Sequence, residues 1–273
     1  MKPLPGCANL GTCARRGKGL GHPAPPMPDL MRRVRDTLQM GLGGPTKTDI
    51  VGAPGSIQLR NVTAGYGGAP VLSAFDLHIN PGEFVYVVGP SGAGKTTLLR
   101  VLFGVVRPKT GWVLVDGIAV HRLQGWQTDT IRRRVGCVFQ TYELLPHLTS
   151  LENVLLPLQL AHARMRNAKA CAVEALELVG LNDKLHEFPG TLSGGQQQRV
   201  AVARAIAHQP RVLLADEPTG NVDSQSSAEI MELFGQLNEM GSTVVMATHD
   251  EFVLSSFTAR EVRLQPKLLK VAS

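Results

Sequence analysis

The chain has 273 residues, which is enough for one large or two small domains with a full hydrophobic core. Residues 1–55 carry eight Lys and Arg and three Asp and Glu, a net charge of +5; subtracting these from the totals of 28 and 22 leaves 20 basic and 19 acidic residues elsewhere. Because the excess charge lies in the tail, nucleic-acid binding by the main part of the chain is not expected. No apolar run is long enough to cross a bilayer, so the chain alone is not a membrane channel.

The N-terminal segment 1–55 has a composition of its own, with 18 Gly and Pro residues in 55 positions. That content is too high for a packed element, so we expect a disordered leader and an ordered domain that begins near Ile57. Within the leader, residues 27–40 place three apolar residues at helical spacing beside arginines, which is typical of a short amphipathic helix touching an anionic membrane surface. The alternatives are a disordered leader, an organellar leader, or sequence upstream of a later start at Met27, Met31 or Met40.

From Ile57 onward the pattern mixes strands and helices. Short apolar or alternating runs predict strands at Ile57–Val62, Phe84–Val88, Val113–Val115, Val135–Phe139, Val212–Ala215 and Thr243–Ala247. Helices are expected at Thr96–Phe103, ending at Gly104, and around Ala228–Asn238. Between about 141 and 208 apolar residues recur at helical spacing, which predicts a mostly helical insertion. No internal repeat is visible, so the chain should contain one such domain rather than a fused pair.

A glycine-rich loop follows the strand predicted at Phe84–Val88. Its sequence, Gly89-Pro90-Ser91-Gly92-Ala93-Gly94-Lys95-Thr96-Thr97, fully matches the phosphate-loop pattern. In this pattern, backbone N–H groups surround the β- and γ-phosphates of a nucleotide, and the next helix points its positive N-terminus at them. Lys95 would add a positive charge, and the Thr96 hydroxyl would contact magnesium. The alternative, a chance glycine-rich turn, is weakened by the strand before the loop and the helix after it.

Two adjacent carboxylates follow another apolar strand. Asp216 and Glu217 come directly after Val212–Ala215, which should place them beside the phosphate loop. Asp216 is then expected to hold magnesium, through water, and Glu217 to orient and polarise the attacking water. A surface Asp-Glu pair is common in isolation, and the catalytic interpretation depends on the phosphate loop.

The segment Leu192–Gln196 (LSGGQ) lies between these two motifs. Its Ser and Gln have capping-box spacing, so it should begin a helix that runs to a stop at Pro210. The two glycines weaken this helix start and leave N–H groups free, an arrangement that suits an anion. The simpler alternative is that the segment only caps the helix.

In this order, the three motifs resemble the nucleotide-binding ATPase subunit of an ABC transporter over about residues 56–265. The resemblance implies an α/β P-loop NTPase fold, with a mixed sheet core, a helical subdomain at about 141–208 and a C-terminal tail at 266–273. It also implies that ATP and Mg²⁺ are bound. Further positions match family positions: Tyr66 for stacking on adenine, Gln140 for sensing magnesium and touching the membrane partner, Gly220–Asp223 for communication across a dimer, and His249 for contacting the γ-phosphate. Outside the family context, Tyr66 and His249 would be ordinary side chains.

The resemblance also implies how such a chain works. In the family, two ATP molecules lie between two ATPase subunits, and the residues Ser193, Gly194, Gly195 and Gln196 face the γ-phosphate held by the other subunit. Hydrolysis removes this bridge and releases the pair. The chain is therefore expected to form a homodimer, or to pair with another ATPase subunit. Its expected location is the cytoplasmic face of the inner or plasma membrane, where a transmembrane partner holds it.

Two stretches indicate a branch of the family. Phe139–Leu158 and Leu213–Asp223 resemble the branch that includes the cell-division ATPase FtsE, the lipoprotein-releasing ATPase LolD and the macrolide-exporter ATPase MacB. Arg132–Gly136 and Met246–Asp250 are more like FtsE, which implies an FtsX-like membrane partner; the arginines could equally form a solvated basic face. The alternatives are the ATPase of an exporter or lipoprotein-releasing complex, and a soluble ABC protein acting on ribosomes or DNA. The last would need a second domain or a coiled-coil insertion, and a non-hydrolysing clamp would lack Glu217 or His249.

Overall fold

The structure is a computed structural model that describes residue 32 and residues 52–161 and 167–265. Apart from Arg32, the amphipathic helix predicted at 27–40 lies outside the described residues, as does the C-terminal tail at 266–273. Within the described residues, no helix is both long enough and apolar enough to span a membrane.

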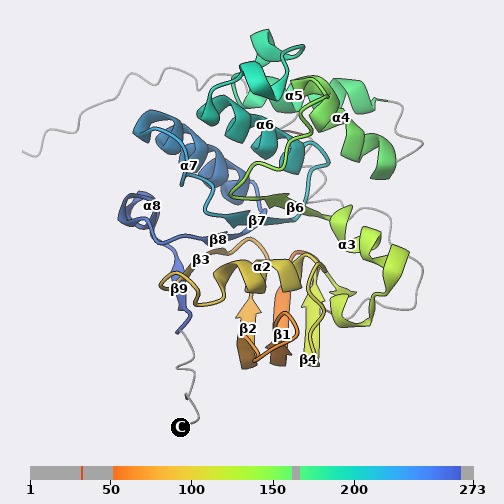
Figure 1. Cartoon of the computed structure of the whole chain (residues 1–273), viewed down its shortest axis with the longest axis vertical. Helices are drawn as coiled ribbons and strands as arrows, with labels where there is room; N and C mark the ends of the chain where they lie inside the picture. The colour runs from red at the N-terminus through yellow and green to blue at the C-terminus, as the bar shows by residue number, and fades with distance from the viewer. Residues whose placement is uncertain (1–31, 33–51, 162–166, 266–273) are drawn as a thin grey trace, which may run out of the picture.

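Two β-sheets build the core (Figure 1). The first is antiparallel, with the strand order β2-β1-β4-β5, and its strands are β1 (Ile57–Ala64), β2 (Leu72–Ile79), β4 (Thr110–Val115) and β5 (Ile118–Ala119). The second is parallel, with the order β6-β7-β8-β3-β9, and its strands are β3 (Phe84–Val88), β6 (Val135–Val138), β7 (Val212–Asp216), β8 (Thr243–Ala247) and β9 (Arg260–Arg263). The six strands predicted from the sequence are all present; β2, β5 and β9 were missed.

Helices cover both faces of the parallel sheet. One helix, α2 (Lys95–Leu102), lies between the two sheets, and it is the helix predicted at Thr96–Phe103 (Figure 1). On the other side of the parallel sheet lie α4 (Ser150–Ala161), α5 (Ala168–Leu178), α6 (Gly194–Ile206) and α7 (Ser224–Glu239). The first three occupy the stretch where a helical insertion was predicted. Two short helices, α3 (Asp129–Arg132) and α8 (Glu251–Ser256), complete the described chain, together with 3₁₀ turns at Val120–Arg122, Gly125–Thr128, Asn182–Lys184 and Pro189–Thr191.

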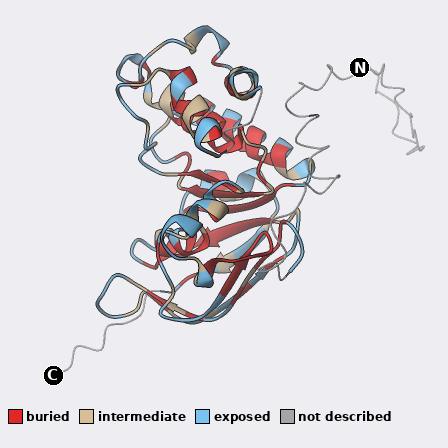
Figure 2. Ribbon diagram, turned by 90° about the vertical axis from the view of Figure 1, so that its right-hand side faces the viewer, coloured by how far each residue is buried: buried red, intermediate tan, exposed pale blue. Residues whose placement is uncertain are grey.

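The parallel strands alternate between two hydrophobic cores because successive side chains of a strand point to opposite faces. In β3, Phe84, Tyr86 and Val88 belong to the hydrophobic core that includes α4, α5, α6 and α7. Val85 and Val87 belong to the core that includes α2 and the antiparallel sheet. The neighbouring strands β7 and β8 divide their side chains in the same way. Every residue of β3, β7 and β8 is buried, and Figure 2 shows the buried strands in red. Such strands are nearly continuous apolar runs, which is why they were visible in the sequence.

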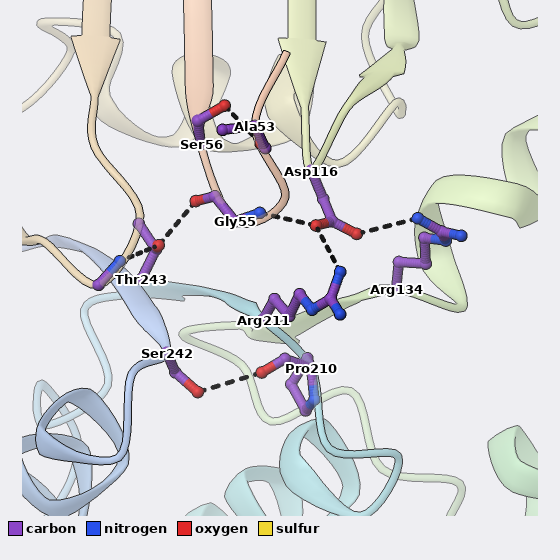
Figure 3. Close-up of polar contacts among 10 residues, drawn as sticks. Ala53, Gly55, Ser56, Asp116, Arg134, Pro210, Arg211, Ser242 and Thr243 are labelled. Atoms are coloured by element: carbon purple, nitrogen blue, oxygen red, sulfur yellow. Dashed lines mark hydrogen bonds and ion pairs between the residues drawn. The ribbon is translucent and has the colours of Figure 1, made fainter. Parts of the chain in front are cut away.

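A polar cluster joins the two sheets at the edge away from the carboxyl ends of the parallel strands (Figure 3). The Asp116 carboxylate, in the turn between β4 and β5, accepts a hydrogen bond from Gly55 N at 2.7 Å and one from Arg134 Nη1 at 3.3 Å, and Arg211 Nη1 lies 4.0 Å away. The Thr243 hydroxyl donates to Gly55 O at 2.7 Å. These contacts hold the start of β1 against the starts of β6, β7 and β8. Arg134 is therefore part of an internal ion pair, whereas Arg132 and Arg133 are exposed.

Candidate nucleotide-binding site

The strand order of the parallel sheet places the loops that follow β6, β7, β8 and β3 next to one another. Because β6, β7, β8 and β3 are neighbours and run in the same direction, the segments that follow them emerge along one edge. These segments carry Gln140, Glu217, His249 and the phosphate loop. Together they line a cavity of about 490 Å³, whose walls are Val71, Pro90, Ser91, Gly92, Ala93, Gly94, Lys95, Thr96, Thr97, Gln140, Glu217 and His249.

The phosphate loop needs glycine where it enters α2. Gly94 has φ +100°, in the left-handed region, and a Cβ atom at this position would lie 2.8 Å from Val71 Cγ1. Any side chain would therefore be strained and would also clash with the wall of the cavity. The close approach of Val71, just before β2, makes this residue part of the site, although nothing in the sequence singled it out.

Lys95 is the first residue of α2 and is 7% exposed. Its Nζ donates to Gly89 O at 2.8 Å and lies 3.8 Å from Glu217 Oε1. The ammonium group is thus inside the loop, at the position where the phosphate-loop pattern predicts a charge for phosphate oxygens. A cation held there by backbone carbonyls is available to a negatively charged ligand in the cavity.

Glu217 is the residue on which the predicted site residues converge. Its carboxylate accepts a hydrogen bond from Gln140 Nε2 at 3.1 Å, and His249 Nδ1 lies 2.9 Å from its Oε1 atom. The backbone has φ +46°, and its N–H donates to Ala247 O at 2.8 Å. Left-handed backbone in a residue other than glycine is strained, and such strain is concentrated at functional sites. The Glu217 side chain is therefore aimed into the cavity by its backbone and by two neighbouring loops.

Asp216 occupies the last position of β7 and is buried. Burial raises the pKa of this carboxyl, and a hydrogen bond with the Thr96 side chain acts in the opposite direction. Thr96 and Asp216 are thus adjacent oxygen donors, as a magnesium site in a nucleotide hydrolase requires. Among the residues that the structure describes, no group of three His, Cys, Asp or Glu could hold a metal ion. The two oxygen donors Thr96 and Asp216 fit a hard cation such as magnesium.

Tyr66 lies apart from the cavity walls. Its side chain is 57% exposed, on the loop between β1 and β2, and its hydroxyl accepts a hydrogen bond from Arg100 Nη1 at 3.1 Å. The Arg100 guanidinium carbon is 6.0 Å from the ring centroid. The same hydrogen bond is the largest cause of the raised pKa of Arg100. An exposed aromatic ring fixed by a cation is suited to stacking on a flat ligand.

The LSGGQ segment caps α6 as the sequence predicted, although the helix ends at Ile206 rather than at Pro210. Ser193 Oγ accepts from Gln196 N at 3.3 Å, and Gln196 Oε1 accepts from Ser193 N at 2.9 Å. None of Ser193, Gly194, Gly195 and Gln196 is among the residues that line the 490 Å³ cavity. Within a single chain, the capped end of α6 is therefore not part of the wall of this cavity.

The parallel sheet with its phosphate loop defines a P-loop nucleotide hydrolase, and three comparisons narrow the class. The ABC transporter family matches residues 72–220. The cell-division ATP-binding protein FtsE of Streptococcus pneumoniae is 42% identical over 210 residues, 77% of this chain and 91% of that protein. The lipoprotein-releasing system ATP-binding protein LolD of Bacteroides fragilis is 43% identical over 210 residues, 76% of this chain and 97% of that protein.

Solved structures agree with this result. A structure described as the dimeric, post-hydrolysis state of the ATP-binding cassette MJ0796 bound to ADP and Pi has a TM-score of 0.71 and 39% identity, and the match covers 77% of this chain and 96% of that one. The chain therefore belongs to the ABC transporter family, in the branch of FtsE and LolD. It is an ATP-binding and ATP-hydrolysing subunit with the α/β fold that the sequence predicted.

Proposed function

We propose that this chain binds Mg²⁺-ATP at the phosphate loop, pairs with a second ATPase subunit around two nucleotides, and uses hydrolysis to drive a membrane partner. The observation that carries the proposal is the convergence of Lys95, Gln140 and His249 on Glu217 at the wall of one cavity. This arrangement places a cation, a polar amide and an imidazole around a single carboxylate beside a phosphate-binding loop.

The proposed roles follow from these positions. Lys95 and the loop N–H groups, from Gly89 to Thr97, neutralise phosphate oxygens. Thr96, Asp216 and Gln140 would hold magnesium, which supplies charge neutralisation at the phosphates when it is bound. Glu217 accepts a proton from the attacking water, and His249 contacts the γ-phosphate while fixing the Glu217 carboxylate. Tyr66 stacks on the adenine ring.

Pairing of two subunits is proposed because the capped end of α6 does not reach its own chain's cavity. Ser193, Gly194, Gly195 and Gln196 are suited to an anion but are not among the residues that line the cavity. In a pair, this end of α6 would face the nucleotide of the other subunit. The MJ0796 cassette, whose structure is described as dimeric with ADP and Pi, supports this arrangement.

A second cavity is our proposed docking site for the membrane partner. It has a volume of about 280 Å³ and lies between β6 and the helices α4 and α6, with walls formed by Phe103, Arg132, Arg133, Val135, Cys137, Phe139, Glu143, Pro157, Arg204, Ala205 and His208. Its apolar floor and its basic rim suit a partner segment that carries both apolar and acidic side chains. The resemblance to the family implied contact with the membrane partner at Gln140, which is close in the chain to the lining residues Phe139 and Glu143.

The partner we propose first is FtsX-like, with a role in cell division, held at the cytoplasmic face of the membrane. Five of the relatives are named FtsE, including those of Mycobacterium tuberculosis and Bacillus subtilis. The second candidate is a lipoprotein-releasing complex, which the 43% identity to LolD supports equally well. The identity values do not separate the two, so the partner itself must be identified.

Affinity purification of the chain from detergent-solubilised membranes, followed by mass spectrometry, identifies the partner. Recovery of an FtsX-like protein is the expected result. A LolC- or LolE-like permease would replace cell division with lipoprotein release, and the absence of any membrane protein would contradict the docking proposal.

Variants of the basic rim test the docking site itself. Arg132→Glu together with Arg133→Glu should reduce partner recovery at least about tenfold, because two attractive charge pairs become repulsive. The matched control is Arg107→Glu, an exposed arginine that does not line this cavity. Equal recovery of the partner by the double variant and the control would place the interface elsewhere.

A further inference from the structure

The loop that carries Gln140 has a strained backbone. Tyr142 has φ +60° and Glu143 has φ +54°, two consecutive left-handed residues of which neither is glycine. Glu143 N donates to Thr141 O at 2.6 Å, which closes a three-residue turn around Tyr142. Tight turns of this kind with positive φ at the central residue are rare and strained. Such a conformation persists only where surrounding groups hold it.

Arg204, which lines the cavity proposed for the partner together with Glu143, supplies that support. It lies on α6, the helix that begins with the LSGGQ segment. Its Nη1 donates to Glu143 O at 2.5 Å and its Nη2 donates to Tyr142 O at 2.6 Å. The planar fork of one guanidinium group thus binds the carbonyls of both left-handed residues. Lysine could not reproduce this two-point contact, because it presents a single point charge.

The strained turn is connected to the catalytic carboxylate by short contacts. The Tyr142 hydroxyl donates to Asn221 O at 3.3 Å, and Asn221 Nδ2 donates to Gln140 O at 3.2 Å. Gln140 Nε2 in turn donates to Glu217 Oε2 at 3.1 Å. The conformation of the turn therefore determines where the Gln140 amide lies relative to Glu217.

We propose that Arg204 is a positioning residue for ATP hydrolysis: it holds the strained turn at Tyr142–Glu143 and thereby keeps Gln140 in reach of Glu217. The inference rests on the proposed roles of Gln140 and Glu217. Because α6 is continuous from Gly194 to Ile206, the same helix presents the LSGGQ segment at one end and holds the Gln140 loop near the other. A shift of α6 on contact with a second subunit's nucleotide would therefore be transmitted to Gln140.

Steady-state ATP turnover by Arg204→Lys tests this role. The turnover number should fall about 10- to 100-fold, as misplacement of a catalytic group by about 1 Å does, while the KM for ATP changes less than about threefold. The KM is preserved because the phosphate loop is untouched. Glu143→Gly, added to Arg204→Lys, should recover most of the lost turnover, since glycine adopts left-handed backbone without support. A merely structural role of Arg204 in packing α6 would not respond to a glycine in the loop.

A second pair of variants leaves α6 intact, so the test remains decisive even where Arg204→Lys fails to fold. Glu143→Val and Glu143→Gly both remove the same exposed side chain. Only valine is strained in the left-handed backbone conformation, which glycine adopts freely. Valine should lower turnover at least fivefold relative to glycine. Normal turnover by Arg204→Lys, absence of rescue in a folded double variant, or equal turnover of the valine and glycine variants would overturn the proposal. Retained turnover in Glu217→Gln would instead overturn the site assignment on which it rests.

Discussion

At the scale of single residues, Glu217 is the carboxylate on which the proposed site residues converge. Its carboxylate lies 3.8 Å from Lys95 Nζ, 3.1 Å from Gln140 Nε2 and 2.9 Å from His249 Nδ1. The sequence predicted Lys95 from the phosphate-loop pattern and Glu217 from its position after an apolar strand, whereas Gln140 and His249 were predicted only through the resemblance to the family. The left-handed backbone of Glu217 was not predictable, because it depends on a hydrogen bond with Ala247, which lies 30 positions further along the chain.

The contribution of the loop cation is tested by Lys95→Ala. ATP turnover should fall at least about 100-fold, because a preorganised positive charge at the phosphates is lost. Nucleotide titration measures ATP binding, and phosphate release measures ATP turnover. The matched control is Lys184→Ala, which removes a lysine in a 3₁₀ turn far along the chain from the cavity walls. Unimpaired binding and turnover in Lys95→Ala would exclude this residue from the site.

Glu83 provides a test of pH dependence. Glu83 directly precedes β3, and Arg260 Nε donates a hydrogen bond to its carboxylate at 2.6 Å. Partial burial raises the pKa of Glu83, but hydrogen bonds from Arg260 and Asn80 outweigh this and hold it below its ordinary 4.5. A lowered pKa stabilises the folded state above the unfolded pKa, and this stabilisation disappears as the pH falls through the folded pKa.

Glu83→Gln should therefore lower the free energy of unfolding at pH 7, by less than about 1 kcal/mol since the pair is partly exposed to salt and water. The difference from the wild type should shrink as the pH falls below the ordinary value of 4.5. Urea unfolding at several pH values measures it, with Glu239→Gln as a surface control. A difference that stays constant with pH would show that the ion pair is not its cause.

At the scale of elements, the sequence predicted the buried strands best. Strands such as β3 and β7 are buried on both faces and read as continuous apolar runs. β2 and β9 were missed because their exposed positions carry polar side chains at the sheet edge, where pairing with a neighbour rather than hydrophobicity forms the strand. The contact of Arg204 with the Gln140 loop was also invisible, since it joins residues about 60 positions apart.

The junction between the two sheets depends on Asp116. This carboxylate is 4% exposed and is contacted by Gly55, Arg134 and Arg211. Asp116→Asn keeps the shape but leaves the two arginines without their counter-charge, so the free energy of unfolding should fall by about 2–3 kcal/mol. Turnover by the folded fraction should remain, because Asp116 does not line the nucleotide cavity.

Urea unfolding compares Asp116→Asn with Asp129→Asn. The control removes an exposed carboxylate on α3 that pairs with Arg132 at 3.8 Å on the surface, so it should cost less than about 0.5 kcal/mol. Equal stability of the two variants would mean that the Asp116 cluster does not hold the sheets together.

At the scale of the whole molecule, the two segments that would contact ATP do not line the same cavity. The phosphate loop and Glu217 line the cavity, whereas the capped end of α6 does not line it. The sequence predicted this division only through its resemblance to a family, because no periodicity or spacing reveals which surfaces meet in a pair. A site completed by a second subunit makes association of the chains depend on ATP, and hydrolysis then limits how long the pair persists.

ATP-dependent pairing of two subunits is tested most directly by the molar mass of Glu217→Gln in solution, measured by light scattering with and without Mg²⁺-ATP. The amide preserves the cavity but cannot accept the proton of the attacking water, so ATP should remain bound. The account predicts a monomer without nucleotide, a stable dimer with ATP and no turnover. The control Glu261→Gln, on the exposed strand β9, should turn over ATP as the wild type does. Normal turnover by Glu217→Gln, or a monomer with ATP bound, would contradict the account.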